Sequence, residues 1–322
     1  MRGNSLSLMW VAALGALLVA NFALSMTGVH VSPGPKGLVL GWSAAFWLSL
    51  CFIIRPQCRW ARRVLAAGNG LLLLSVIGVT GALLSYYTVR VSPFPLADTV
   101  LYRADLTIGL DWLAVYRSYA GFSPVHLLAN RLYLTIFDTP YVIVIGLAAA
   151  GRDDKLLTFI GAFAIGLLLT ILVSFFLPAA SPVIHFFGSS PPYVPTTGTG
   201  YYPVLTELRS QRIMHVASHE LFGLLTFPSF HAVSAVLFAW AGWSLRYLRW
   251  PVLAVNAGML VVTPLEGSHY FVDLIAGCLV ALAAIVLVET CARQARQRRS
   301  QALLPVPTAA MAGLEPYRAL AE

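Results

Sequence analysis

The sequence predicts an all-α fold, a polytopic bundle of about eight transmembrane helices, and three observations support this prediction. Hydrophobic residues make up 58% of the 322 residues and charged residues only 11%, whereas soluble domains carry roughly 25% charged residues. The mean hydropathy of the chain is +0.77. Apolar segments recur along the chain, and most approach the roughly 20 residues that a helix needs to cross a bilayer. We therefore expect an integral membrane protein.

Eight apolar segments follow one another along the chain. They cover roughly 6–28, 38–54, 64–87, 136–150, 156–177, 231–247, 250–265 and 270–291. The first segment also resembles a signal peptide, because Arg2 precedes the apolar run and Ala23 to Ser25 is a tolerable cleavage site. The run is longer than a usual signal core, so we expect a retained helix.

Lysine and arginine residues indicate the orientation of the bundle, because cytoplasmic loops are enriched in them. With the N-terminus in the cytoplasm, every short loop that carries several basic residues is cytoplasmic, and both termini are cytoplasmic. Two long loops, 88–135 and 178–228, then face the periplasm or exterior of what we expect to be a bacterial inner membrane. The basic residues lie on both sides without a recognition motif, so we do not expect a nucleic-acid partner.

The two long loops are expected to lie over the bundle. Residues 104–122 suit a helix in the membrane interface, anchored by Trp112. They form either a simple cover or a substrate gate. The proline and glycine residues of 178–228 predict an irregular segment, which is suited to lining a pocket for a lipid headgroup.

Three polar residues stand at the starts of two apolar segments. His231 follows Pro228 and Ser229, a strong helix-capping pair. His269 and Asp273 are four residues apart, so they share a helix face. The 38 residues from His231 to His269 are enough for one helix that crosses the membrane and a second helix that returns. We therefore expect the two histidines to meet at the same face of the membrane.

This arrangement predicts a site for an anion. With Ser229 and Ser268 as the capping residues, two helix N-termini are directed at the space between the histidines, and free N–H groups at helix N-termini attract phosphate. Asp273 would hold one ring nitrogen of His269 as a donor and leave the other as a nucleophile or base.

Three other interpretations remain open at this point. His269 and Asp273 can be a structural pair that only locks helix packing. The two histidines, Asp273 and Glu266 can bind a metal ion. A proton-coupled transporter is the non-enzyme alternative, although the helix after Asp273 has no further acidic or basic residue until Glu289.

The same residues resemble a known superfamily. P-S-F-H at 228–231 and H-Y-F-V-D at 269–273, followed by Gly277, resemble the second and third signature blocks of the type 2 phosphatidate phosphatase superfamily, usually P-S-G-H and S-R-x5-H-x3-D. The bulky Phe230 in place of the glycine, the HYFVD block and the segment ADLTIGLDW are similar to the inositol phosphorylceramide synthase (inositol phosphotransferase) branch. The resemblance covers roughly residues 100–290.

The resemblance implies a six-helix catalytic core and a phosphohistidine mechanism without a metal or other cofactor. By position, His269 is the nucleophile, Asp273 orients it, and His231 protonates the leaving alcohol; Ser229 is assigned to substrate binding. The superfamily's first block, K-x6-R-P, is missing, and Thr263 stands at the arginine position of the third block. Arginines that clamp phosphate are therefore expected elsewhere, and the candidates are Arg103, Arg131, Arg209 and Arg212.

We therefore expect three parts: N-terminal transmembrane helices over 1–90, a catalytic membrane domain over 91–291, and a basic, disordered cytoplasmic tail over 292–322. The expected activity is transfer of an inositol phosphate-like headgroup between lipids at the outer leaflet. The expected partners are phosphatidylinositol or phosphatidate and a ceramide-like acceptor. Lipid phosphate hydrolysis is the alternative within the same chemistry.

Overall fold

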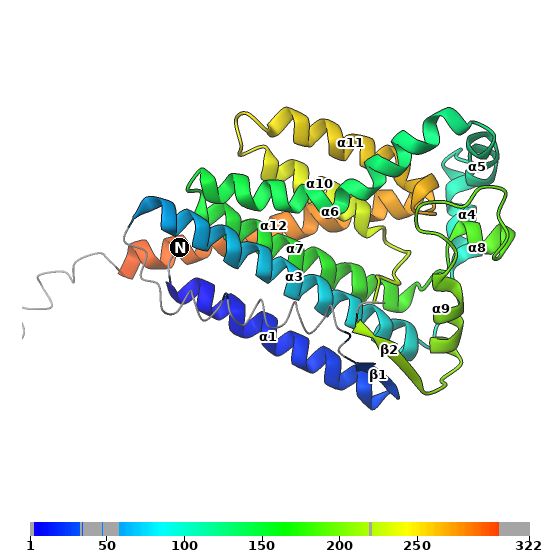
Figure 1. The fold of residues 1–322 in the computed structure, drawn as a ribbon, viewed down its shortest axis with the longest axis horizontal. Helices are drawn as coiled ribbons and strands as arrows, with labels where there is room; N and C mark the ends of the chain where they lie inside the picture. Colours follow the sequence, from blue (N-terminus) through cyan, green and yellow to red (C-terminus); the bar gives the residue numbers. More distant parts are fainter. Residues whose placement is uncertain (1–2, 33, 35–46, 48–57, 219–220, 303–322) are drawn as a thin grey trace, which may run out of the picture.

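The computed structural model describes residues 3–32, 34, 47, 58–218 and 221–302, and they form an almost entirely helical protein (Figure 1). Within these residues, seven helices run side by side along the long axis of the molecule. They are α1 (Gly3–Met26), α3 (Arg59–Val91), α6 (His126–Ala149), α7 (Asp153–Phe176), α10 (Phe230–Gly242), α11 (Arg249–Glu266) and α12 (Phe271–Ala302).

Five of the described helices are long and apolar enough to cross a membrane. They contain Leu6–Met26, Arg59–Val91, Ser123–Ala149, Asp153–Phe176 and Phe271–Arg298, and Phe230–Gly242 is a shorter apolar helix. The prediction of an all-α integral membrane protein is therefore confirmed. The expected segment 38–54 lies outside the described residues except for position 47.

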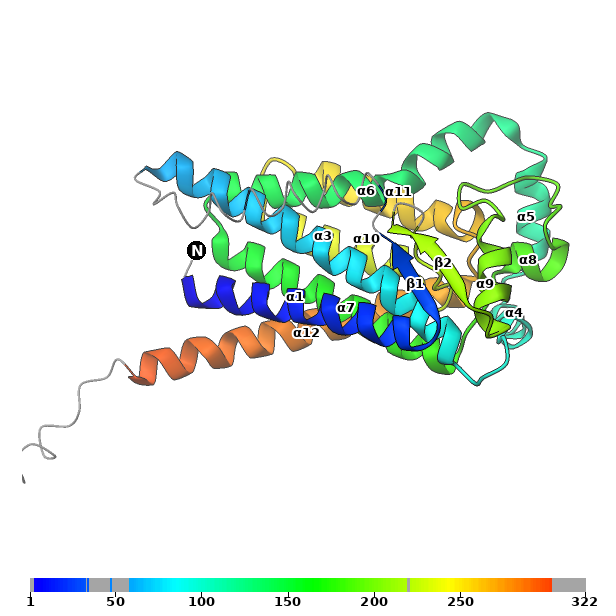
Figure 2. The same ribbon diagram turned by 60° about the horizontal axis from the view of Figure 1, so that its bottom comes forward.

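A set of short elements covers one end of the bundle, and we call α4 (Asp98–Thr107), α5 (Trp112–Ala120), α8 (Pro182–Phe187) and α9 (Tyr201–Arg209) the capping layer. A single turn of 3-10 helix, η1 (Ser123–Val125), joins α5 to α6. Beside the capping layer, β1 (Val29–Ser32) pairs in parallel with β2 (Met214–Ala217), with Val29 opposite Met214. The start of α1 and the end of α12 lie at the opposite end of the bundle (Figures 1 and 2).

Helix packing explains why the histidine motifs come together. α10 packs against α11 and α12, α11 packs against α6, and α12 packs against α7. The main core is apolar and includes Ile143, Phe159, Val233, Phe238 and Ala281, all at most 3% exposed. The bundle therefore holds the starts of α10 and α12 side by side.

Several sequence predictions need correction here. The helix expected over 136–150 begins ten residues earlier, at His126, so Arg131 and Tyr133 belong to α6 rather than to a loop. Residues 104–122 form the end of α4 and all of α5, with a break at Gly109, whose φ is +79°.

Trp112 does not anchor a helix in the membrane interface, because its side chain is fully buried. Its indole Nε1 donates to the carbonyl of Pro264 at 2.9 Å, which ties α5 to α11.

Residues 178–228 are more regular than expected, because they include α8, α9 and β2. In α9, Leu205 and Leu208 are buried in a cluster with Tyr86 of α3, and this apolar contact stabilises a helix within a proline-rich segment. The first residues of the expected tail, 292–302, are helical as the end of α12, and residues 303–322 lie outside the described part of the chain.

Candidate active site

His231 and His269 lie together under the capping layer. His231 is the second residue of α10, and His269 precedes α12 by two residues. The centres of their rings are 6.5 Å apart, and the ring planes make an angle of 54°. The hairpin of α10 and α11 brings the second histidine back to the first, as the spacing predicts.

His269 and Asp273 form the expected pair. Nδ1 of His269 lies 3.1 Å from Oδ2 of Asp273, and the same carboxylate oxygen accepts from the amide of Tyr270 at 3.0 Å. Asp273 is fully buried and His269 is 5% exposed. A carboxylate at Nδ1 leaves Nε2 of the imidazole for chemistry.

The turn before His269 differs from the prediction. α12 begins at Phe271, so Ser268 does not cap it; the hydroxyl of Ser268 accepts from the amide of Val183 at 3.0 Å instead. Ser268 has a φ of +52°, so the turn is tight. A Cβ atom on the preceding residue, Gly267, would lie 2.8 Å from Cε2 of Tyr133 and 2.9 Å from Cδ2 of His269, so this position needs glycine.

The N-terminus of α12 is capped by another element. Asp105 of α4 accepts from the amides of Phe271 and Val272 at 2.9 and 2.8 Å. The expectation that the amides at this helix end are free for an anion is therefore wrong, because a buried carboxylate already occupies them.

Asp98 lies two helical turns before Asp105 on the same face of α4, and its carboxylate also accepts hydrogen bonds from backbone amides. It accepts from the amides of Ala180 and Ser181 at 2.9 and 3.0 Å and from the hydroxyl of Tyr270 at 3.2 Å. α4 thus binds both the segment before α8 and the turn that carries His269.

Ser229 joins the two histidine motifs. Its hydroxyl accepts from the amide of Ala232 at 3.4 Å, as expected for a capping residue of α10, and its own amide donates to the carbonyl of Asp273 at 3.1 Å. Ser229 is fully buried and is not among the residues that line the cavity described next, so its observed contacts are structural.

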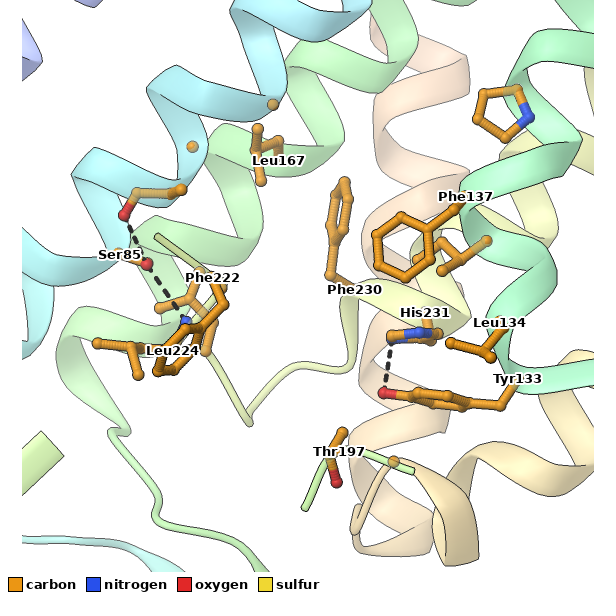
Figure 3. A pocket seen from close by; sticks show the side chains of 18 of the residues that line it. Ser85, Tyr133, Leu134, Phe137, Leu167, Thr197, Phe222, Leu224, Phe230 and His231 are labelled. Atoms are coloured by element: carbon orange, nitrogen blue, oxygen red, sulfur yellow. Dashed lines mark hydrogen bonds between the residues drawn. The ribbon is translucent and has the colours of Figure 1, made fainter. Parts of the chain in front are cut away.

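Both histidines line a cavity of about 820 Å³, and Figure 3 shows the part of it around His231. Near the histidines the cavity is lined by the hydroxyl-bearing residues Tyr133, Ser181, Thr196, Thr197 and Tyr201. It continues along α3 from Ser85 to Leu71, which is about 21 Å at the helical rise of 1.5 Å per residue. This part is mainly apolar, with Leu74, Phe137, Phe163, Leu167 and Phe230 in its wall.

Tyr133 of α6 is a residue that the motifs do not indicate. Its ring stacks on that of His231, with centres 4.1 Å apart and planes 14° apart, and its hydroxyl lies 3.4 Å from Nδ1 of His231. Figure 3 shows the stack at the wall of the cavity. Nε2 of His231 is buried and has no hydrogen-bond partner among the described residues.

Glu266 fixes the loop that carries Thr196 and Thr197 of the cavity wall. Its carboxylate accepts from the hydroxyls of Tyr119, Tyr193 and Thr196, the Tyr193 contact being 2.8 Å. It also accepts from the amide of Thr196 at 2.9 Å. Since these donors occupy the carboxylate, Glu266 serves the loop, and the described residues contain no group of three His, Cys, Asp or Glu side chains that could hold a metal ion.

The four candidate arginines do not line the cavity. Arg103, Arg131 and Arg212 are exposed. The guanidinium of Arg209 donates to the carbonyl of Phe94 at 2.7 Å, and so fastens α9 to the segment before α4. The structure therefore does not bring these arginines to the histidine pair.

Burial sets the protonation of the His269 imidazole. Removal from solvent lowers the pKa of His269 to about 4, and a contact with the backbone of Thr226 acts in the opposite direction. Burial also raises the pKa of Asp105, while the amides of Val272 and Phe271 lower it. A neutral imidazole is the form that can act as a nucleophile.

Sequence signals for the additional residues were weak. Asp98 and Asp105 are acidic residues seven apart in a largely apolar segment, which is the only hint that they face the protein interior. Tyr133 lies outside every motif, and Glu266 draws attention only because it stands three residues before His269.

Comparison with known proteins agrees with this geometry. Residues 99–287 match the family model of the PAP2 superfamily. No curated protein and no solved structure matched the chain. The family match supports an enzyme with phosphoesterase or phosphotransferase chemistry on lipid phosphates. The match covers more than half of the chain and contains both histidine motifs, so the chain belongs to the PAP2 superfamily.

Proposed function

We propose that this protein is a membrane-embedded lipid phosphotransferase that works through a phosphohistidine on His269. The observation that carries the proposal is the pair of histidines, His269 buried and His231 half-buried, in the wall of a long, mainly apolar cavity. Such a cavity suits the hydrocarbon chains of a lipid, while the histidines and neighbouring hydroxyl groups suit its phosphate. The catalytic unit we propose is the membrane domain over 91–291.

The proposed reaction has two steps. Nε2 of His269 attacks the phosphorus of the donor lipid, the bond from phosphorus to the leaving oxygen breaks, and His231 gives that oxygen a proton. The acceptor hydroxyl then attacks the phosphohistidine, its proton passes to His231, and the phosphorus–nitrogen bond breaks. Asp273 keeps the imidazole of His269 in the required orientation through the bond at Nδ1.

The finer assignments follow the resemblance to the inositol phosphotransferase branch. We propose phosphatidylinositol as the donor, a ceramide-like lipid as the acceptor, and a site at the outer leaflet of a bacterial inner membrane with both termini cytoplasmic. Phosphate binding by Arg103, Arg131, Arg209 and Arg212 stays a prediction, and each is tested by replacement with glutamine.

The test uses purified protein in detergent micelles with chelator present. Phosphatidylinositol or phosphatidate is supplied with and without a ceramide-like acceptor, and the products are measured for the parent, His269→Ala and, as a matched control, the exposed His185→Ala. The proposal expects diacylglycerol release that depends on acceptor, is lost in His269→Ala and persists in His185→Ala.

Other outcomes decide between the alternatives. Free phosphate from phosphatidate without acceptor identifies a lipid phosphate phosphatase. Loss of activity on chelation supports a metal site. If neither lipid is turned over and His269→Ala behaves like the parent, the enzyme proposal fails, and proton-coupled transport is the next property to measure.

A further inference from the structure

The stack of Tyr133 on His231 bears on how the acid of the reaction is kept charged. His231 is half-buried at the start of α10, with its Nε2 shielded from solvent, and an imidazolium is disfavoured where water is excluded. A residue that protonates a leaving alcohol must nevertheless hold its proton when the phosphorus–oxygen bond breaks. Some neighbouring group therefore has to stabilise the charged form.

Besides Tyr133 of α6, the titratable groups around His231 come from α9, α11 and α12 with the turn before it. His269, before α12, lies 6.5 Å away between ring centres, and its own charge would repel an imidazolium. The carboxylate of Asp273 is bound to His269 and to the amide of Tyr270, and that of Glu266 to the loop over the cavity. Tyr201 bonds to Ser181 and to the carbonyl of Ala180.

Tyr133 is the group in direct contact with the ring of His231. The two rings are nearly parallel, 14° apart, at 4.1 Å between centres, so the imidazole lies over the electron-rich face of the phenol. A cation over an aromatic face is stabilised, and more so when it is desolvated. The phenol oxygen, 3.4 Å from Nδ1, lies over the face of the stacked imidazole, so the negative end of the hydroxyl dipole adds to this stabilisation.

The same contact fixes the direction of the ring. With Nδ1 at the hydroxyl of Tyr133, Nε2 is the nitrogen left for a ligand, and it is buried without a partner among the described residues. His231, Tyr133 and His269 all line the cavity. Gly267 allows this arrangement, because any larger residue there would press on Tyr133 and His269 together.

We propose that Tyr133 is a positioning residue that stabilises the imidazolium form of His231 through the face of its ring, with Nε2–H directed at the leaving-group oxygen of the bound phosphate ester. This inference rests on the proposed function and adds a residue that lies outside both histidine motifs. The proton on Nε2 passes to the leaving oxygen as the phosphorus–oxygen bond breaks, and His231 is left neutral.

The test compares two donors that carry the same phosphate group and differ in leaving group. An alkanol needs a proton to leave, whereas p-nitrophenolate leaves readily without one. General acid catalysis contributes about 10²-fold to 10⁴-fold. Tyr133→Leu is expected to slow turnover of the alkyl donor by about 100-fold and of the nitrophenyl donor by less than about 3-fold. Tyr133→Phe keeps the stack without the hydroxyl and is expected to lie between Tyr133→Leu and the parent.

A pH profile gives a second readout. Without Tyr133 the imidazolium loses its proton more easily, so the alkaline limb for the alkyl donor moves to lower pH in Tyr133→Leu. Tyr141→Phe is the matched control, because it removes another phenol hydroxyl of α6 from the cavity wall, and it is expected to leave both the donor preference and the limb unchanged.

The outcomes separate the two claims. If the parent turns over both donors and the Tyr133 variants slow both equally with an unmoved limb, the inference is overturned while the proposed function stands. If the parent turns over neither donor, the proposed function fails and the inference with it. If Tyr133→Leu does not fold, Tyr133→Phe decides the matter by the same ratio of rates.

Discussion

The carboxylate of Asp105 in α4 accepts the backbone amide of Val272 in α12 at 2.8 Å, across 167 residues of sequence. With the second bond, from Phe271 at 2.9 Å, each carboxylate oxygen accepts one amide at the start of α12. The position of His269 therefore depends on a residue of the capping layer.

Asp105→Asn is the first prediction that follows. Asparagine offers one oxygen and one NH₂ group, so one amide of α12 is left facing a donor, and an unsatisfied buried group costs about 1–3 kcal/mol. We expect a loss of stability of that size in thermal unfolding and a fall in turnover. The control is Asp111→Asn, because Asp111 caps α5 through a single oxygen that asparagine retains. Equal stability of the two variants would contradict this account.

Gly277→Ala tests the contact between the two histidine helices. A Cβ atom there would lie 2.5 Å from the carbonyl oxygen of Ser229 and 2.8 Å from Cβ of Ala232. The helices have to move apart, which we expect to cost about 1–3 kcal/mol, and turnover falls because His231 and His269 separate. Gly15→Ala in α1, where a Cβ atom meets nothing within 4 Å, is the control in thermal unfolding and activity assays. Turnover in Gly277→Ala equal to that of the parent would contradict the prediction.

The buried imidazole of His269 predicts how stability depends on pH. Its pKa falls from 6.5 to about 4 in the folded protein, so below pH 6.5 the unfolded chain binds more protons. Stability is then complete above about pH 6.5 and falls as the pH drops towards 4. The total contribution is about 3 kcal/mol at 1.36 kcal/mol per pKa unit. Unfolding measured from pH 4 to 7 is expected to show a smaller slope in His269→Asn than in the parent, and identical slopes would contradict the assignment.

Glu266→Gln tests the loop that carries Thr196 and Thr197 of the cavity wall. The amide of glutamine cannot accept at both ends, so the hydroxyls of Tyr119 and Tyr193, or the amide and hydroxyl of Thr196, lose their acceptor. We expect KM to rise about tenfold, equivalent to about 1.4 kcal/mol of binding, with a smaller change in kcat. Protease is expected to cleave residues 189–200 faster. The exposed Glu207→Gln is the control, and an unchanged KM with unchanged cleavage would rule out this role.

The parts of the site that depend on helix periodicity could be predicted from the sequence. Thirty-eight residues between His231 and His269 fit one hairpin, and a spacing of four places Asp273 beside His269, because both follow from helix dimensions. The contact between Asp273 and His269 and the approach of the two histidines are observed.

The remaining parts depend on which surface each short helix buries. Proline and glycine in 178–228 predict an irregular chain. The burial of Leu205 and Leu208 against α3 nevertheless stabilises α9 as a helix. Trp112 has the amphipathic side chain of an interface anchor, yet its indole donates to the buried carbonyl of Pro264, which also accepts from the amide of His269. Tyr133 belongs to no local pattern, because the packing of α6 against α10 and α11 brings it to the wall of the cavity beside His231.

Asp98 and Asp105 also limit how this protein can be altered by engineering. Since α4 binds both the turn that carries His269 and the segment before α8, it belongs to the framework of the reaction centre. A chimera that exchanges α4 for the corresponding segment of a distant relative would replace the support of the nucleophile together with the surface. Transplanting specificity between such proteins should therefore move α4 and the start of α12 as one unit.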